Sequence, residues 1–233
     1  MKLRVIKGLS HEFDRMKRVV GLVTMDMKFA SLFRESMSKM GVKTIHTLST
    51  DELPFSVDVV VTKKGELRGE ISNRKILYLE DYRDLDELAE KVLEILKGVE
   101  SYRSILIGID PGKTIGVAFS VNYKIIRTLK YFHEEKMIED VKAFIERHRE
   151  AEEKIIVVGS TTTEGESSRL QKILTKRLGD IERLKIEFID ESRTTRGLVP
   201  REKNLSKDEY SAILLSLRRS RFKKGGSLCR YIN

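Results

Sequence analysis

Residues 105–120 read ILIGIDPGKTIGVAFS, and this stretch contains the clearest strand pattern in the second half of the chain. One apolar run brings Asp110 to a Pro-Gly turn, and a second apolar run leaves that turn. The pattern predicts strands over 104–110 and 115–121, and a third strand over 124–131 after a tight turn near Asn122. Asp110 itself could be a metal ligand, a residue of a phosphate site, or only the first residue of an Asp-Pro-Gly turn.

The segments after these three strands alternate between helices and strands. Buried strands are predicted for KIIVVGS (154–160) and LKIEFIDE (184–191), and helices over 134–149, 165–178 and 206–222. Strands joined by short loops pair antiparallel, and strands joined through helices pair parallel. The order β-β-β-α-β-α-β-α therefore predicts a mixed five-stranded sheet with flanking helices.

The first half of the chain predicts a smaller α/β domain. We expect helices over 28–41 and 84–98, with Asp84 as a helix cap, and strands over 17–25, 42–48, 57–63 and 74–81. Such alternation is typical of a mostly parallel sheet covered by helices. The predicted domains are 1–100 and 101–233, with the boundary in GVESYRS (98–104). The isolated polar residues of the first domain are interpreted as structural, and its function is not predicted: Asp26, His46, Glu80 and Asp81.

The net charge of +9 is concentrated toward the C-terminal end. Residues 1–100 hold 18 Lys and Arg against 17 Asp and Glu, and residues 101–233 hold 27 against 19. Within 193–230 there are 11 basic and three acidic residues, a net charge of +8. A run of charge can be no more than a solvated surface, but its concentration in one segment favours a polyanionic partner such as nucleic acid.

Composition narrows the class of protein further. The single cysteine, Cys229, excludes an internal disulfide framework and a cysteine-rich zinc site. No run of 18 apolar residues and no signal-like start is present, so we expect a cytoplasmic protein without a membrane partner. Charged residues make up 35% of the chain, glutamine occurs once and tryptophan is absent, a bias that resembles hyperthermophile proteins.

Four motifs follow one another in the second half: IDPGKTIGVAFS on the first strand, IIVVGSTTTEG on the fourth, DESRTT after the fifth, and DEYSA in the last helix. In this combination the second half resembles the RNase H-like superfamily, specifically the RuvC/YqgF-type nuclease family. The corresponding family motifs are D-x-G-x-x-x-G-V-A, an apolar strand running into G-x-P-x-x-x-D-G, then D-E-R-x-T-T, and D-x-x-A-A. The resemblance is closest to the YqgF pattern and covers nothing before residue 100.

The resemblance implies that Asp110, Glu191 and Asp208 are catalytic metal ligands, with Asp190 as a further ligand or neighbour. Strand ends and a helix packed over them can bring such carboxylates together, and a carboxylate cluster is costly unless a cation neutralises it. Oxygen ligands without His or Cys suit Mg²⁺ or Mn²⁺. Such ions activate a water and stabilise the leaving oxygen in phosphodiester hydrolysis.

Each acid also has a structural interpretation. Asp190 and Glu191 end an apolar strand, where polar residues are common. Asp208 lies in SKDE, a capping box in which Ser206 caps the helix and Glu209 stands three residues later. The residues that follow Asp208 at helical spacing are small or apolar, so its face is predicted to turn toward the sheet: Ser211, Ala212 and Leu215.

The chain departs from RuvC-type resolvases at two positions. Gly159-Ser160 stands where those enzymes carry a glutamate at the end of the fourth strand, and Leu205 stands where they carry an acid one turn before the last-helix aspartate. Glu191 would then supply the second carboxylate, and Glu164 or Glu166 would assist or be exposed. One metal, two metals and a degenerate, binding-only site all stay open.

These features predict a metal-dependent nuclease acting on structured nucleic acid, either Holliday-junction-like DNA or precursor ribosomal RNA. The alternatives are a non-catalytic nucleic-acid-binding module of the same fold and an actin/hexokinase-like phosphotransferase, which would need a second such domain that the first half does not supply. A homodimer is left open as its assembly. Phosphate contacts are predicted for these residues: Lys113, Arg193, Thr194, Thr195, Arg196, Arg201, Lys203, Arg218, Arg219 and Arg221.

Overall fold

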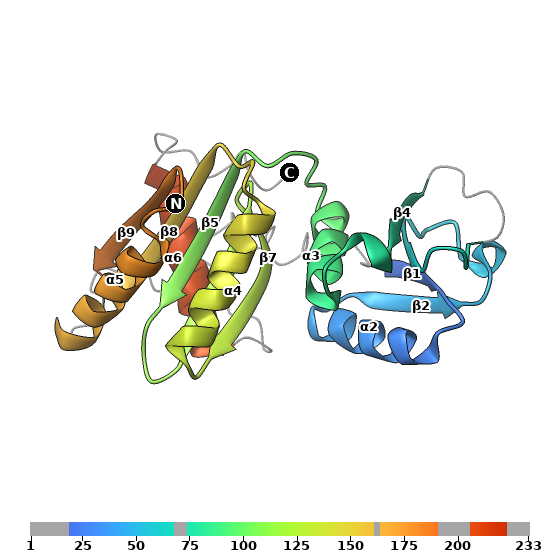
Figure 1. The fold of residues 1–233 in the computed structure, drawn as a ribbon, viewed down its shortest axis with the longest axis horizontal. Coiled ribbons are helices and arrows are strands. Elements are labelled where there is room, and N and C mark those ends of the chain that lie inside the picture. Colours follow the sequence, from blue (N-terminus) through green and yellow to red (C-terminus); the bar gives the residue numbers. More distant parts are fainter. Residues whose placement is uncertain (1–18, 68–73, 161–163, 191–205, 223–233) are drawn as a thin grey trace, which may run out of the picture. The chain divides into compact units, whose positions relative to one another are not determined.

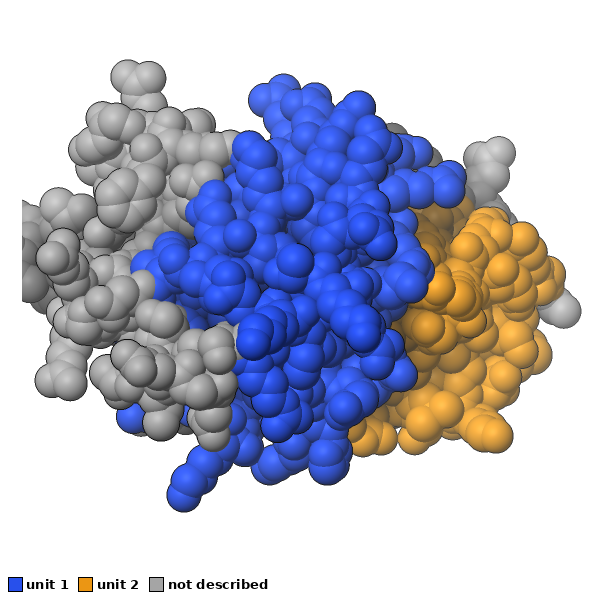
Figure 2. Space-filling view, turned by 60° about the vertical axis from the view of Figure 1, so that its left-hand side comes forward, with its two compact units in different colours: residues 1–10, 101–233 blue, residues 11–100 orange. Residues whose placement is uncertain are grey.

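The computed structural model describes residues 19–67, 74–160, 164–190 and 206–222 of the 233-residue chain. These residues divide into two compact units between Glu100 and Ser101, which we call the N-terminal unit and the C-terminal unit. Figure 2 colours the two units separately. Within the described ranges, no helix has the length and apolar character needed to cross a membrane.

The N-terminal unit is built on a four-stranded, fully parallel sheet with the strand order β2-β1-β3-β4. Its two longer helices follow β1 and β4, as predicted, and two short 3₁₀ helices lie in the connections. The bounds are β1 Val19–Val23, α2 Met27–Lys39, β2 Lys43–Thr47, η1 Thr50–Glu52, β3 Val59–Thr62, β4 Lys75–Tyr78, η2 Leu79–Asp81 and α3 Leu85–Leu96.

The predicted Asp84 cap is confirmed, and glycines follow the ends of both helices. The Asp84 side chain accepts a hydrogen bond from the backbone N–H of Glu87 at the start of α3. Gly41 and Gly98, just beyond the two helices, have φ values of 71° and 63°, which favour glycine.

The last predicted strand of this unit, 74–81, is too long. β4 ends at Tyr78, and Leu79–Asp81 form the 3₁₀ helix η2. The reason is the length of the neighbouring strand, since the β3–β4 pairing ends with Thr62 opposite Tyr78. Beyond that pair, the carboxylate of Glu80 accepts the backbone N–H of Lys64 instead of continuing a ladder (2.9 Å).

The C-terminal unit contains the predicted mixed sheet of five strands, in the order β7-β6-β5-β8-β9. β6 pairs antiparallel with both β5 and β7, whereas β8 pairs parallel with β5 and β9. Consequently β5, β7, β8 and β9 all end at the same edge of the sheet. The bounds are β5 Ser104–Asp110, β6 Ile115–Val121, β7 Lys124–Tyr131, α4 Glu134–Arg147, β8 Glu153–Ser160, α5 Glu164–Leu178, β9 Leu184–Asp190 and α6 Lys207–Phe222.

Helices cover both faces of this sheet, and Figure 1 shows α4 and α5 on one face and α6 on the other. Along each strand, successive side chains point alternately toward the α4 and α5 side and toward the α6 side of the sheet. On the α4 side, Phe119 of β6 contacts Phe144 with a ring-centroid distance of 4.9 Å, and both are fully buried. On the α6 side, Leu106, Ile155 and Val157 form a buried cluster with Leu215.

Glycines allow α6 to lie directly on the sheet. A Cβ added to Gly108 of β5 would come within 3.0 Å of the carbonyl oxygen of Ala212, and one added to Gly116 of β6 would overlap the carbonyl group of Asp208. Ala118 and Ala212 continue the same contact as a buried pair. Small residues on both elements therefore fix where the first turn of α6 rests.

Candidate active site

Asp110 is the last residue of β5 and is half-buried. It lies directly opposite Gly116 in the antiparallel β5–β6 pair, which puts the two Cα atoms about 5 Å apart. Gly108 and Gly116 both face α6, and the side chain of Asp110 follows the same alternation. The carboxyl group of Asp110 therefore projects toward the layer that holds α6.

Asp208 of α6 lies against the same end of the sheet. It lies in the first turn of α6, and its backbone carbonyl rests on Gly116. Gly116 is also paired with Lys130 of β7, so Asp110, Gly116 and Lys130 form one row across three strands. The helix thus places Asp208 over the middle of a row that begins with Asp110.

The Asp208 carboxylate is turned toward the sheet, as its helical face predicted. Its side chain is 27% exposed, and its Oδ2 accepts a hydrogen bond from the Thr114 hydroxyl. The ammonium group of Lys130 lies 3.7 Å from the same oxygen. A hydroxyl from the turn after Asp110 and an ammonium from β7 therefore hold this carboxylate.

Glu209 accounts for the capping box. Its Oε2 accepts the backbone N–H of Ser206 at 3.0 Å, and its own N–H donates to the Ser206 hydroxyl at 3.3 Å. Its other oxygen accepts the hydroxyl of Thr128 on β7 at 3.0 Å. Both carboxylate oxygens of Glu209 are therefore used in contacts at the start of α6, which is a structural role. The capping box does not use the carboxylate of Asp208.

The other predicted acids are described only in part. Asp190 ends β9 opposite Ser160 of β8, at the same sheet edge as Asp110, and the structure describes only its backbone. Glu191 lies outside the described residues. Among the residues that are described, no group of three or more His, Cys, Asp or Glu side chains could hold a metal ion. Asp110 and Asp208 are the part of the predicted ligand set that can be placed.

Most of the predicted phosphate contacts also fall beyond the described side chains. Lys113 is exposed in the turn after Asp110. For Arg218, Arg219 and Arg221 the structure gives only the course of α6. The remaining predicted contacts lie outside the described residues: Arg193, Thr194, Thr195, Arg196, Arg201 and Lys203.

Sequence reasoning missed two residues that contact Asp208, namely Thr114 and Lys130, and also Thr128, which donates to the neighbouring Glu209. A further missed residue, Phe132, follows β7 and is 74% exposed. Thr128, Lys130 and Phe132 alternate along RTLKYFH (127–133), which is the signal of a strand face. The alternation alone does not indicate which face of the sheet these residues occupy, because that face depends on the register of β7 with β6.

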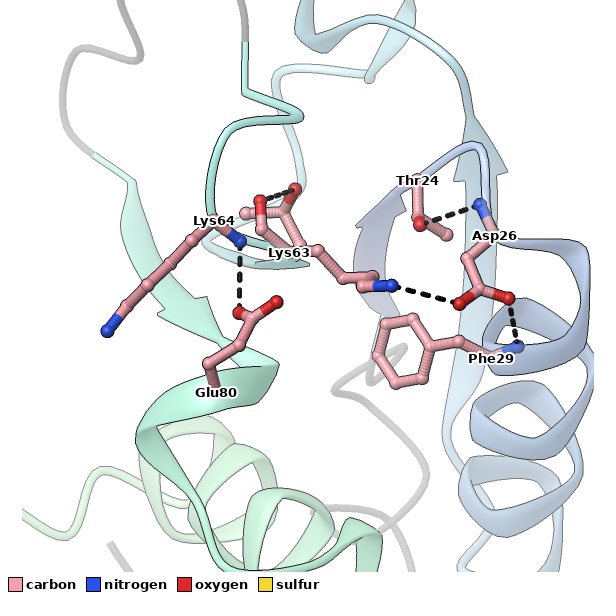
Figure 3. A network of polar contacts seen from close by, with 7 residues as sticks. Thr24, Asp26, Phe29, Lys63, Lys64 and Glu80 are labelled. Atoms are coloured by element: carbon pink, nitrogen blue, oxygen red, sulfur yellow. Dashed lines mark hydrogen bonds and ion pairs between the residues drawn. The ribbon is translucent and has the colours of Figure 1, made fainter.

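The polar residues of the N-terminal unit have structural partners, as their interpretation requires. Figure 3 shows Lys63 reaching Asp26, with a distance of 3.0 Å from its Nζ to the carboxylate. Asp26 also caps α2 by accepting the N–H of Phe29, and these contacts lower the pKa of its carboxyl group, the hydrogen bond from Phe29 most of all. His46 Nε2 lies 3.0 Å from the carbonyl oxygen of Thr24.

Comparison with known proteins does not identify a family for this chain. A scan against models of protein families and a search of curated proteins found no match to this chain.

Proposed function

We propose that the C-terminal unit is a divalent-metal-dependent nuclease that hydrolyses phosphodiester bonds in structured nucleic acid, either branched DNA or precursor ribosomal RNA. The observation that carries the proposal is the contact between the Asp208 backbone and Gly116, the residue paired with Asp110. Two acids that are 98 positions apart in the sequence are thereby brought to one end of one sheet. The resemblance to RuvC/YqgF-type nucleases names the same two residues.

The donors at this end fit Mg²⁺ or Mn²⁺. Asp110 and Asp208 offer carboxylate oxygens, the Thr114 hydroxyl lies against Asp208, and all three are oxygen groups of the kind that these hard cations prefer. Glu191, outside the described residues, is predicted to add the third carboxylate. A bound ion would supply Lewis-acid polarisation of the phosphate and an activated water.

The residues of the chain supply orientation and charge. Thr114 fixes one oxygen of Asp208, which leaves the other oxygen of that carboxylate for a cation. Lys130 balances the negative charge of Asp208 and is close enough to contact a phosphate that approaches the acids. The basic residues of 193–230 would hold the remainder of the polyanion without reading its sequence.

The experiment that tests this proposal is incubation of the full chain with a substrate panel in Mg²⁺ or Mn²⁺. The panel consists of a four-way DNA junction, a linear duplex of the same length and a structured RNA. We expect cleavage of the junction or of the structured RNA in preference to the duplex, and loss of cleavage when the metal is chelated. No cleavage of any substrate with either metal would contradict the proposal.

One observation favours a non-catalytic nucleic-acid-binding module as the second candidate. Lys130 already compensates the charge of Asp208 at 3.7 Å, so this acid has a cationic partner within the protein. A metal that binds only the folded state raises stability by about 2.7 kcal/mol at a concentration of 100 times its Kd. The nuclease should melt at a higher temperature in Mn²⁺, whereas a binding module without a metal site should bind nucleic acid and show no such shift.

A further inference from the structure

Phe132 is an exposed aromatic residue at the end of the sheet that holds Asp110 and Asp208. Its side chain is 74% exposed, whereas Phe119 and Phe144 of the same unit are fully buried. It directly follows β7, whose last residue, Tyr131, pairs with Ile115 of β6. The adjacent row of the sheet contains Asp110, so Phe132 emerges at the edge where β5 ends. The exposed phenyl ring leaves a flat apolar surface available at this end of the sheet.

Lys130 links this ring to the Asp208 carboxylate. Its Nζ lies 5.8 Å from the centroid of the Phe132 ring and 3.7 Å from Oδ2 of Asp208. An ammonium within about 6 Å of a ring is attracted to the π-electrons of that ring. The ring, the ammonium and the carboxylate therefore form one continuous surface on the α6 side of the sheet.

This surface has the chemistry that recognises a single unpaired nucleotide. A base can stack on the flat ring, and the phosphate of the same nucleotide can pair with the ammonium. Bases inside a duplex are already stacked, so the ring can take only a base from a loop, bulge, junction or end. An apolar protein segment fits less well, because it would remove the charged Lys130 and Asp208 from water. Among the described residues of this unit, Phe132 is also the one strongly exposed large apolar side chain, so no apolar patch surrounds it.

We propose that Phe132 and Lys130 form a platform that holds one unpaired nucleotide beside Asp208. This inference rests on the proposed nuclease function and deepens it. It specifies that the substrate has an unpaired nucleotide next to the phosphate presented to Asp110 and Asp208. A continuous duplex cannot occupy the platform.

The test measures binding in the presence of a chelator, so that cleavage does not interfere. The probes are two fluorescein-labelled hairpins with equal numbers of phosphates and a base-free linker in place of the loop nucleotides, one fully paired and one with a bulged nucleotide, each made as DNA and as RNA. The proteins are the full-length wild type, Phe132→Ala, Phe132→Trp and Phe55→Ala. Phe55 is the matched control, because it is a fully exposed phenylalanine (101%) in the N-terminal unit.

We expect Phe132→Ala to weaken binding of the bulged hairpin by about 5- to 150-fold, the range that stacking on one aromatic ring supports. Binding of the paired hairpin should not change, and Phe132→Trp should retain the preference for the bulge. Phe55→Ala should match wild type on both probes. The comparison of DNA with RNA shows which backbone the platform accepts.

Equal affinities for Phe132→Ala and Phe55→Ala on the bulged hairpin would overturn the platform, and metal-dependent cleavage by wild type would then keep the nuclease proposal. An equal loss on both hairpins would also overturn it, because the ring would not be selecting an unpaired base. Absence of binding to either hairpin by wild type would overturn the platform and the proposed function together.

Discussion

Two side chains, Thr114 and Lys130, set the environment of Asp208, and both bind the same oxygen. A hydroxyl that donates to a metal-binding carboxylate orients that carboxylate, and loss of such a partner commonly costs about 10- to 100-fold in metal affinity or activity. The hydrogen bond joins residues that are far apart in the chain, so it also fastens α6 to the turn after Asp110.

We therefore expect Thr114→Val to lower metal-dependent cleavage by about 10- to 100-fold and Thr114→Ser to restore it. Valine has nearly the shape of threonine but cannot donate to Asp208. Thr128→Val is the matched control, because the Thr128 hydroxyl donates to Glu209 of the capping box. The measurement is the cleavage rate as a function of Mn²⁺ concentration, and equal rates for the two valine variants would refute a role for Thr114 in orienting the ligand.

Asp26 offers a prediction for the N-terminal unit. Hydrogen bonds from Phe29 and Lys63 lower the pKa of its carboxyl group below the ordinary 3.8. A lowered folded-state pKa means that the ionised carboxylate stabilises the fold above pH 3.8, and that this contribution disappears as the pH falls through the lowered pKa. The pair with Lys63 is one-third exposed, so the contribution is small.

Asp26→Asn should keep the helix cap, because asparagine caps helices well, but it should remove the ion pair. Its free energy of unfolding should fall slightly below that of wild type at neutral pH and converge with it well below pH 3.8. Asp26→Ala should be less stable than Asp26→Asn, since it also removes the cap. Urea unfolding at the two pH values measures this, and a constant difference between wild type and Asp26→Asn would contradict the role of the ion pair.

At the scale of elements, the position of α6 depends on two glycines in the strands beneath it. A methyl group at Gly116 would overlap backbone atoms of Asp208, and backbone at the start of a helix cannot move aside as a flexible side chain can. Gly116→Ala should therefore destabilise the protein by about 1–3 kcal/mol or more. It should also reduce cleavage, because it lifts Asp208 away from Asp110.

Gly112→Ala is the matched control for this substitution. A Cβ at Gly112 would meet only the carbonyl oxygen of Thr114, at 3.4 Å, and its backbone is not in the left-handed region. Thermal unfolding and cleavage of the two variants should differ clearly. A Gly116→Ala protein that melts at the same temperature as Gly112→Ala would show that α6 does not rest on β6 at this point.

The elements of the chain could be predicted from sequence because each carries its own local signal. Asp84, Gly98 and the capping box at Ser206 mark helix ends, and Asn122 and Tyr123 have positive φ values (49° and 65°) in the predicted tight turn. The strand predicted over 74–81 was too long because its true end is set by the neighbouring strand β3, which a local pattern does not contain.

The environment of Asp208 could not be predicted for a related reason. Counting back from the turn at Asn122 would place Leu129 opposite Gly116. A register shift between Phe119 and Ser120 moves the pairing by one residue and brings Lys130 into that position instead. Because a shift of one residue reverses the face of every side chain beyond it, Lys130 and Phe132 join the site only once the irregularity is known.

At the scale of the whole molecule, the distribution of charge predicts how nucleic acid is held. The net charge of +8 within 193–230 should make affinity fall with salt, by about 0.9 in the logarithmic slope for each phosphate neutralised on duplex DNA. Replacing Arg218, Arg219 and Arg221 by Ala should flatten that slope by up to about 2.7 while the protein stays folded.

A second triple variant controls for the loss of three charges. Lys172, Lys176 and Arg177 are exposed on α5 and lie outside the predicted contact segment. Replacing them by Ala changes the net charge equally, and the salt slope should stay near that of wild type. Equal slopes for the two triple variants would assign the polyanion contact to the general charge of the protein and not to the end of α6.

The cleavage rate of Asp110→Asn tests the proposed nuclease most directly. Asparagine preserves the size of the side chain and suits a turn as well as aspartate does, so a residue that only starts the turn would tolerate it. If Asp110 binds the metal, cleavage in Mg²⁺ or Mn²⁺ should fall by at least about 10²–10³, while metal-free binding of nucleic acid and the melting temperature are retained or increase. Cleavage by Asp110→Asn at the wild-type rate would contradict the account and reduce residues 105–120 to a strand, a turn and a strand.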